Sequence, residues 1–194
     1  MAGIGLSKPY FALYSNTGNT VTYSDGGVLG KATSMSLSLE EGGDNILYAD
    51  NAPAETDAGV FAGGTVTVGL DRLPIAVAAK IFGGTVESVT TPATASRLDF
   101  KSGQTIPYCG LAFIQKKQEN NATTWTAWVY YKCQARIPGE EMTTQGDTIE
   151  WQTPELEFSL LRDDTADEKW CSRFDGITTE ANAEAIIKNL FDIS

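Results

Sequence analysis

Histidine is absent from this 194-residue chain. Histidine is the usual general base near neutral pH and a common metal ligand, so its absence excludes Ser-His and Cys-His nucleophilic catalysis and most catalytic zinc sites. The glycine-rich segment Gly26–Lys31 is not a phosphate cradle, because Asp25 and Ala32 stand where a P-loop needs glycine and Ser or Thr. A glycosidase needs two carboxylates that face each other across a cleft. Acidic pairs such as Glu140 and Glu141 are neighbours in sequence, and neighbours on a strand point to opposite faces, which argues against that role. We expect no catalytic residue, no metal site and no cofactor, and therefore a protein that is not an enzyme.

Basic residues are scarce. The chain has 14 Lys and Arg against 25 Asp and Glu, which gives a formal net charge of −11. Up to Arg136 there are 10 basic and 11 acidic residues, whereas from Ile137 onward there are 4 basic and 14 acidic residues. The longest basic run is Lys116–Lys117. Tight binding to nucleic acid needs basic groups that displace counterions from phosphates, so we expect at most contact without adhesion.

Cysteines are few and long apolar runs are missing. The spacings between Cys109, Cys133 and Cys171 match no metal or redox motif, and we expect three reduced thiols. No apolar run approaches the ~20 residues that span a bilayer, and Met1–Tyr10 lacks the apolar stretch of a signal peptide. We expect synthesis in a cytoplasm and no membrane partner.

Strict alternation of apolar and polar residues is the dominant pattern. In the segment Thr33–Glu40 the apolar residues are Met35, Leu37 and Leu39, and Val60–Asp71 repeats the pattern less regularly. Period-2 alternation predicts strands with one buried face and one face that contacts water or a partner. The polar residues of these two strands that we assign to the second face are Ser34, Ser36, Ser38, Glu40, Thr65 and Thr67.

Further strands follow from β-propensity and turn residues. A short hairpin is expected over Lys8–Tyr14 and Thr20–Tyr23, and a long one over Tyr108–Gln118 and Thr123–Arg136. A long strand is predicted over 147–161. Its apolar positions change from odd to even near Thr153-Pro154, so we expect a β-bulge there.

Two helices and one long loop complete the expected elements. The helix Leu73–Phe82 has Pro74 in its first turn and Gly83-Gly84 after its end, and it should pack one face on a sheet. The helix Thr179–Phe191 has Thr178 or Thr179 as a candidate N-cap, and it could dock on this subunit or on a neighbour. The segment Gly42–Gly59 reads as an eighteen-residue acidic loop, a length typical of functional or mobile loops. Asp163–Glu168 is expected to form a solvated turn.

Four stretches of the sequence are similar to the major tail, or tail tube, proteins of long-tailed phages with non-contractile tails. The resemblance covers most of the chain and depends on pattern over length. The stretches are Lys8–Tyr14; the strand Ala32–Glu41 with the acidic loop that follows it; Gly64–Val68 leading into Leu73–Gly83; and, most specific, Gly146–Glu157, which reads Gly-Asp-Thr-Ile-Glu-Trp-Gln-Thr-Pro-Glu-Leu-Glu.

The resemblance implies a single mainly-β domain over residues 1–194. Its antiparallel sheets would form a β-sandwich or a partly rolled sheet with one flanking α-helix, a long extended loop over 42–59, and an acidic turn and helix over 163–194. It also implies a homo-oligomer of stacked rings, each of six copies, in the virion tail. Tape-measure, tail-tip and tail-terminator proteins would be its partners, and DNA would pass transiently down the lumen.

Two sets of residues are candidates for assembly. The six polar residues assigned above, Ser34 to Thr67, are the lumen-facing candidates. The candidate inter-subunit loop comprises Gly42, Gly43, Asp44, Ile46, Tyr48, Asp50, Pro53, Glu55, Asp57 and Gly59. Two alternatives stay open: a carbohydrate-binding or adhesin-type β-sandwich that uses Trp125 and Trp128 as a platform, and a tube protein of a contractile or secretion system.

Overall fold

The computed structural model describes residues 2–42, 45–49, 52–57, 60–139, 144 and 152–193. The protein is mainly β, as the sequence predicts. The first strands are β1 (Ala2–Thr17), β2 (Thr20–Val28), β3 (Ala32–Glu41), β4 (Asn45–Ala49), β5 (Ala52–Asp57) and β6 (Phe61–Leu70). They are followed by α1 (Ile75–Phe82), β7 (Thr85–Val89), β8 (Ala95–Asp99), β9 (Tyr108–Glu119), β10 (Ala122–Ala135), β11 (Glu155–Leu161), β12 (Cys171–Ile177) and α2 (Glu180–Leu190).

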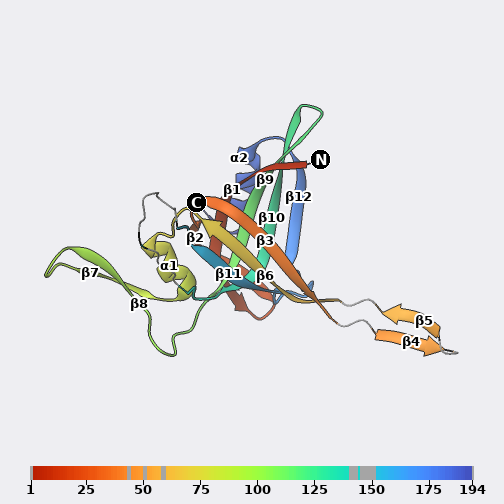
Figure 1. The fold of residues 1–194 in the computed structure, drawn as a ribbon, viewed down its shortest axis with the longest axis horizontal. Coiled ribbons are helices and arrows are strands. Elements are labelled where there is room, and N and C mark those ends of the chain that lie inside the picture. The colour runs from red at the N-terminus through yellow and green to blue at the C-terminus, as the bar shows by residue number, and fades with distance from the viewer. Residues whose placement is uncertain are drawn as a thin grey trace.

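One large antiparallel sheet folds over on itself (Figure 1). Its strand order is β2-β1-β9-β10-β11-β6-β3, and β12 also pairs with β10. Strand β10 joins two layers: Trp125–Tyr130 pair with β12, whereas Lys132–Ala135 pair with β11. We call β3, β6 and β11 the front layer, and β2, β1, β9, β10 and β12 the back layer.

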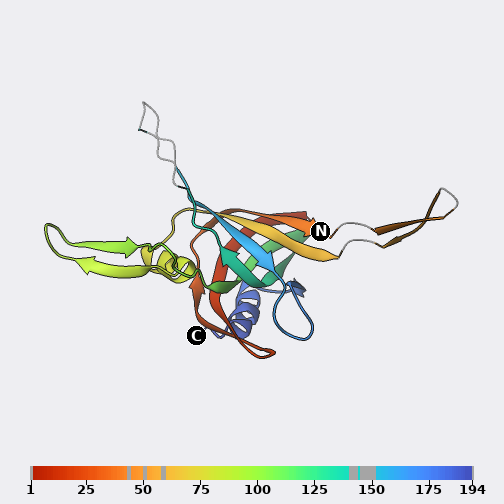
Figure 2. The same cartoon turned by 90° about the horizontal axis from the view of Figure 1, so that it is seen from below.

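Two hydrophobic cores hold these layers. The first lies between the front and back layers and includes Phe11, Val68, Tyr130 and Phe158, with α1 packed at one end. The second lies on the other side of the back layer, where Ala183, Ile187 and Phe191 of the α2 region cover β1, β9 and β10. Figure 2 shows α2 on the side of the sheet away from β3 and β6. The order of layers is therefore sheet, sheet, helix.

Both predicted helices are present, with ends shifted by one or two residues. Helix α1 begins after Pro74 and ends at Gly83, whose φ of 72° is the left-handed conformation that terminates helices. In α2 the Thr179 hydroxyl accepts a hydrogen bond from the backbone N–H of Asn182 at 3.2 Å, as its candidate N-cap role predicts. Of the two docking possibilities for α2, the structure shows contact with its own subunit.

Both predicted hairpins of the large sheet are confirmed, the first with longer strands than expected and the second with ends within one residue of the prediction. Strands β1 and β2 pair from Tyr10 to the turn at Gly18-Asn19. Strands β9 and β10 are joined by Asn120 and Asn121, which have φ of 49° and 62°. Two successive positive φ values are typical of the tight hairpin turn that favours asparagine.

The predicted bulge at Thr153-Pro154 is wrong. Strand β11 begins only at Glu155, and residues Gln152–Pro154 are not in a strand. From Glu155 to Leu160 the register with β6 is continuous. Proline has no N–H for the ladder, and the Pro154 carbonyl accepts a hydrogen bond from the Leu70 N–H at 3.0 Å where pairing starts. Residues 147–151 of the predicted strand lie outside the described residues.

Two hairpins project from the body at opposite ends of its long axis (Figures 1 and 2). One is β4–β5, which corrects the expectation of a structureless loop over 42–59. The other is β7–β8, which the sequence did not predict. Each is a separate two-stranded sheet, a unit that is at best marginally stable by itself in water.

Candidate assembly surfaces

The six lumen-facing candidates share one face of the front layer. Ser36 lies opposite Thr67 and Ser38 lies opposite Thr65 in the β3–β6 ladder. Directly opposed residues point to the same side of a sheet, and residues two apart on a strand do so as well. Ser34 and Glu40 therefore belong to this side, and all four β3 candidates are exposed.

The same face continues across two more strands. Glu157 lies opposite Thr67, and Ser159 lies opposite Thr65, so β11 adds its polar residues to the face. Gln134 of β10 lies opposite Ser159, and Arg136 donates to the Ser159 hydroxyl at 3.1 Å. We call this surface the polar face, and it comprises Ser34, Ser36, Ser38, Glu40, Thr65, Thr67, Gln134, Arg136, Glu155, Glu157 and Ser159.

The opposite side of these strands is apolar. Val66, Val68, Leu156, Phe158 and Leu160 are all fully or almost fully buried between the layers. Burial of each such side chain contributes about 1.5–3 kcal/mol, so a one-residue slip that exchanged the two faces would be strongly unfavourable. The cores of β6 and β11 thereby fix which side chains the polar face presents.

Strand β3 ends the sheet with an open edge. It is ten residues long and contains neither proline nor lysine, and none of the described strands pairs with its outer side. The edge at β2 is different, because β2 is bulged opposite Phe11–Leu13 and the Lys80 ammonium donates to the Asp25 carbonyl at 3.2 Å. Bulges and covering side chains are the usual protection of sheet edges, so β3 is open to another chain. The outer side of the shorter strand β12, which among the described strands pairs with β10, is a third edge of the sheet.

The candidate inter-subunit loop is only partly described. Ile46 and Tyr48 lie on β4, whereas Pro53, Glu55 and Asp57 lie on β5. The base of the segment is closed by the Gly42 N–H, which donates to the Val60 carbonyl at 2.8 Å. Gly43, Asp44, Asp50 and Gly59 lie outside the described residues.

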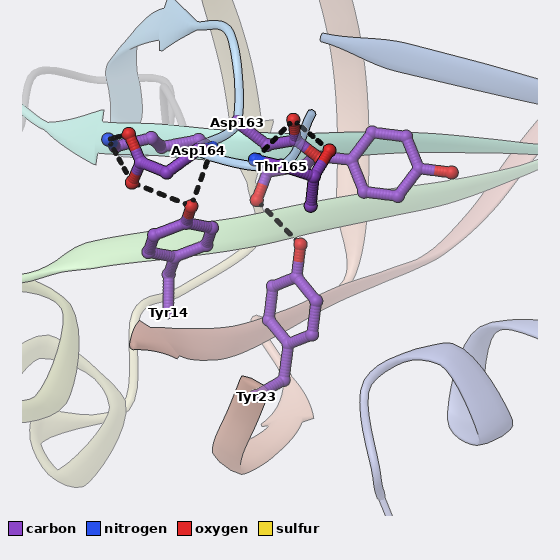
Figure 3. Close-up of polar contacts among 7 residues, drawn as sticks. Tyr14, Tyr23, Asp163, Asp164 and Thr165 are labelled. Carbon is purple, nitrogen blue, oxygen red and sulfur yellow. Dashed lines mark hydrogen bonds and ion pairs between the residues drawn. The ribbon is translucent and has the colours of Figure 1, made fainter. Parts of the chain in front are cut away.

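The acidic segment Asp163–Glu168 is not the solvated turn that was expected (Figure 3). Asp164 accepts from the Lys132 ammonium at 2.7 and 2.8 Å and from the Tyr14 hydroxyl at 2.8 Å. The Lys132 ammonium also lies 5.3 Å from the ring centre of Tyr14 and 4.7 Å from that of Tyr108. The hydrogen bond from Lys132 lowers the pKa of the Asp164 carboxyl.

The neighbouring carboxylate, that of Asp163, forms hydrogen bonds within the turn. Asp163 is buried, and it accepts from the Thr165 N–H at 3.2 Å and from the Thr165 hydroxyl at 2.8 Å (Figure 3). Asp164 thus attaches the connection between β11 and β12 to β1 and β10, and Asp163 holds the turn within that connection. Only the second half of the segment, residues 166–168, is exposed as predicted.

Trp125 and Trp128 do not form one flat platform. They lie three residues apart on β10, and an odd separation places side chains on opposite faces of a strand. Trp125 packs against the core under α2, whereas Trp128 packs against the core between the layers. The two rings therefore cannot stack on the same sugar chain.

The three cysteines are free and all lie on strands. Cys109 and Cys133 are fully buried and lie opposite each other on β9 and β10, and Cys171 lies on β12. Burial raises the pKa of the Cys109 thiol to about 12, which keeps it in the unreactive protonated form.

No family model matches the chain, and no curated protein matches it with significant sequence similarity. Over the described ranges, neither helix is long and apolar enough to cross a membrane.

Proposed function

We propose that this protein is the structural subunit of a phage tail tube, made in the cytoplasm of a host bacterium and located in the virion tail. The subunits polymerise into stacked hexameric rings that enclose the path of the ejected DNA. The observation that carries the proposal is the polar face, which spans the front layer and ends at the open edge of β3.

The open edge supports the formation of a ring. Every second residue of the ten-residue strand β3 directs its backbone N–H and carbonyl to the open edge, and these groups can form a ladder with an edge of a neighbouring copy. Repetition of one such contact around a rotation axis closes a ring, and closure removes the exposed edges. The core between the layers keeps the apolar side of the front layer away from the lumen.

The chemistry of the polar face supports a passage for DNA. Hydroxyl groups and the carboxylates of Glu40, Glu155 and Glu157 dominate it, and Arg136 is its one basic residue, paired with Glu157 at 3.6 Å. Like charge repels phosphate, and a protein with few basic contacts releases few counterions from DNA. Such a wall lets DNA slide without adhesion. Tape-measure, tail-tip and tail-terminator proteins are the partners that the resemblance implies.

The first test is negative-stain electron microscopy of the purified chain over a concentration series, with and without a tail-tip extract. Rings or hollow tubes of uniform diameter are expected. Small monomers under every condition, extract included, would contradict the proposal.

A pair of proline variants tests the edge directly. Successive residues of an antiparallel strand direct their N–H groups to opposite edges. One of the two substitutions Ser38→Pro and Leu39→Pro therefore removes an N–H donor from the open edge, and the other removes a hydrogen bond of the β3–β6 ladder. We expect one variant to melt like the wild type and form no rings, and the other to be destabilised. Normal rings from the variant that melts like the wild type would refute edge pairing by β3.

A further inference from the structure

A pocket lies on the side of the subunit away from the polar face. It is formed by β2, β10, the connection between β11 and β12, and the end of α2, and it has a volume of about 490 Å³. Tyr131 of β10 lines it and packs against the core under α2, whereas its neighbour Tyr130 belongs to the core between the layers. The pocket and the polar face are therefore on opposite sides of the sheet. Volumes of about 300–1,000 Å³ are typical of sites for small molecules.

Hydrogen bonds within the chain hold the walls of this pocket. The Tyr23 hydroxyl donates to the Tyr131 carbonyl at 2.8 Å, and the Tyr131 hydroxyl donates to the Ser172 hydroxyl at 2.8 Å (Figure 3). On the other wall Asp163 is 5% exposed, and its backbone N–H donates to the Lys169 carbonyl at 2.8 Å. Because both tyrosine hydroxyls are bonded within the chain, these residues offer a ligand chiefly the surface of their rings. A preformed site of this kind loses little conformational entropy on binding.

The charges around the pocket restrict the class of ligand. Asp163, Asp167 and Asp192 line it together with one cation, Lys169, whose ammonium pairs with Asp167 at 2.6 Å. Ionised carboxylates accept hydrogen bonds and donate none. Three carboxylates against one ammonium therefore disfavour phosphate and carboxylate ligands, and they favour a ligand that donates hydrogen bonds.

The positions of these carboxylates restrict the ligand further. Over the part of the chain that the structure describes, no group of three or more Asp, Glu or Cys side chains could hold a metal ion. A metal ion needs oxygen ligands that converge on one point. Acceptors that are spread around a pocket instead suit a ligand with several hydroxyl donors in different directions. Val21, Leu190 and the two tyrosine rings add apolar surface, which suits the C–H faces of a sugar ring.

We propose that this pocket binds a neutral hexopyranose unit of a glycan. The carboxylates accept hydrogen bonds from the sugar hydroxyls, and the tyrosine rings and Leu190 contact the apolar faces of the sugar. The proposal goes beyond the proposed function and does not depend on it, because the site is formed by a single chain. In the proposed tube the pocket lies on the outer surface, away from the DNA. Carbohydrate binding, considered above for Trp125 and Trp128, thus has a different location in the molecule.

Saturation-transfer-difference NMR of the full chain tests the class of ligand. The probes are the methyl glycosides of glucose, galactose and mannose, and N-acetylglucosamine. We expect saturation transfer to at least one of them and none to glucuronic acid, which the carboxylates should repel. Transfer to none of the neutral sugars would overturn the proposal. Transfer to 1,4-diaminobutane and to no sugar would also overturn it, because the pocket would then be an amine site.

Two variants with matched controls test the location. Thr22 is an exposed residue of β2 that lines the pocket, and Thr20 is exposed on the same strand but does not line it. Aromatic residues are favourable in strands, so Thr22→Trp and Thr20→Trp should both melt like the wild type. Thr22→Trp should abolish saturation transfer by filling the pocket, and Thr20→Trp should leave it unchanged.

Asp192→Asn should weaken binding about tenfold in an NMR titration, because hydrogen bonds to a charged acceptor are the stronger ones. Glu40→Gln, an equal change of charge on the polar face, should have no effect. Binding at the wild-type level in both Thr22→Trp and Asp192→Asn would overturn the proposed location, as would a loss that the control variants share. Tubes that bind no sugar would refute the pocket alone, and a chain that binds sugar without forming tubes would refute the proposed function alone.

Discussion

The ion pair between Asp164 and Lys132 should be the main stabilising contact of the connection between β11 and β12. The Lys132 side chain is 14% exposed and that of Asp164 is 36% exposed. Substitution Asp164→Ala removes both hydrogen bonds from the ammonium and the acceptor of the Tyr14 hydroxyl, and it leaves a largely buried cation without its carboxylate. The two tyrosine rings beside the ammonium retain only part of the lost interaction.

A hydrogen bond to a charged group contributes about 1.5–3 kcal/mol, and solvent screening at Asp164 reduces this figure. With the loss at Tyr14 included, we expect a cost of about 2 kcal/mol in the free energy of unfolding, or about 4–8 °C in melting temperature. The assay is thermal unfolding of the unassembled chain, followed by circular dichroism. Asp167→Ala is the matched control in the same connection, because its ion pair with Lys169 at 2.6 Å is exposed. It should not shift the melting temperature measurably.

The stabilisation by Asp164 should decrease as the pH falls. The folded-state pKa of Asp164 is lowered, so its contribution is fully present above the unfolded-state pKa near 3.9 and is lost as the pH falls through the folded-state value. The difference between wild type and Asp164→Ala should be constant from pH 7 to about pH 5 and should shrink at lower pH. Equal melting temperatures for Asp164→Ala and Asp167→Ala, or a difference unchanged at pH 2, would refute the reasoning.

Three further predictions concern the lumen, the hairpin and a helix end. Ser36→Lys with Ser38→Lys should leave tubes intact on microscopy but slow DNA ejection, because ammonium groups on the polar face would bind phosphate; unchanged ejection would reject the lumen assignment. Deletion of residues 42–59 should leave a subunit with near-native circular dichroism that forms no tubes, and normal tubes would contradict the stacking role. Gly83→Ala should cost about 2–4 kcal/mol, since φ is 72° and the new Cβ would lie 2.6 Å from the Thr105 carbonyl oxygen. Gly103→Ala, with φ of 82° and no atom within 4 Å, should cost only about 1 kcal/mol in denaturant unfolding.

The elements that the sequence predicted well have one buried face or clear end signals. Alternation located β3 and β6 because Val66 and Val68 face a core while Ser36 and Thr67 do not. Helix α1 could be placed because proline and glycine stand at its two ends. The six lumen-facing candidates consequently share a face, as their pattern requires.

The elements that the sequence did not predict bury neither face or contain residues typical of loops. Strands β7 and β8 are exposed on both sides for most of their length, so no core imposes alternation on them. Glycine, proline and acidic residues made the β4–β5 segment look like a loop. Glu155, Glu157 and Ser159 were missed because one long strand was assumed to pass through Pro154. Ending that strand at the proline leaves Leu156, Phe158 and Leu160 in regular alternation with them.

The body of the subunit and its extensions differ in how far their interactions are satisfied. Within the described residues, no buried side-chain nitrogen or oxygen lacks a hydrogen bond, and both cores are closed by helices or sheets of the same chain. The open edge of β3 and the β4–β5 hairpin, by contrast, both belong to or adjoin the β3–β6 ladder, and neither pairs with another described strand of the sheet. Folding can therefore be completed before assembly, because the residues of both cores are already buried within the single chain. Variants in the ladder's extensions should then change polymerisation without changing the melting temperature of the monomer, whereas variants in the body, such as Asp164→Ala, should do the reverse.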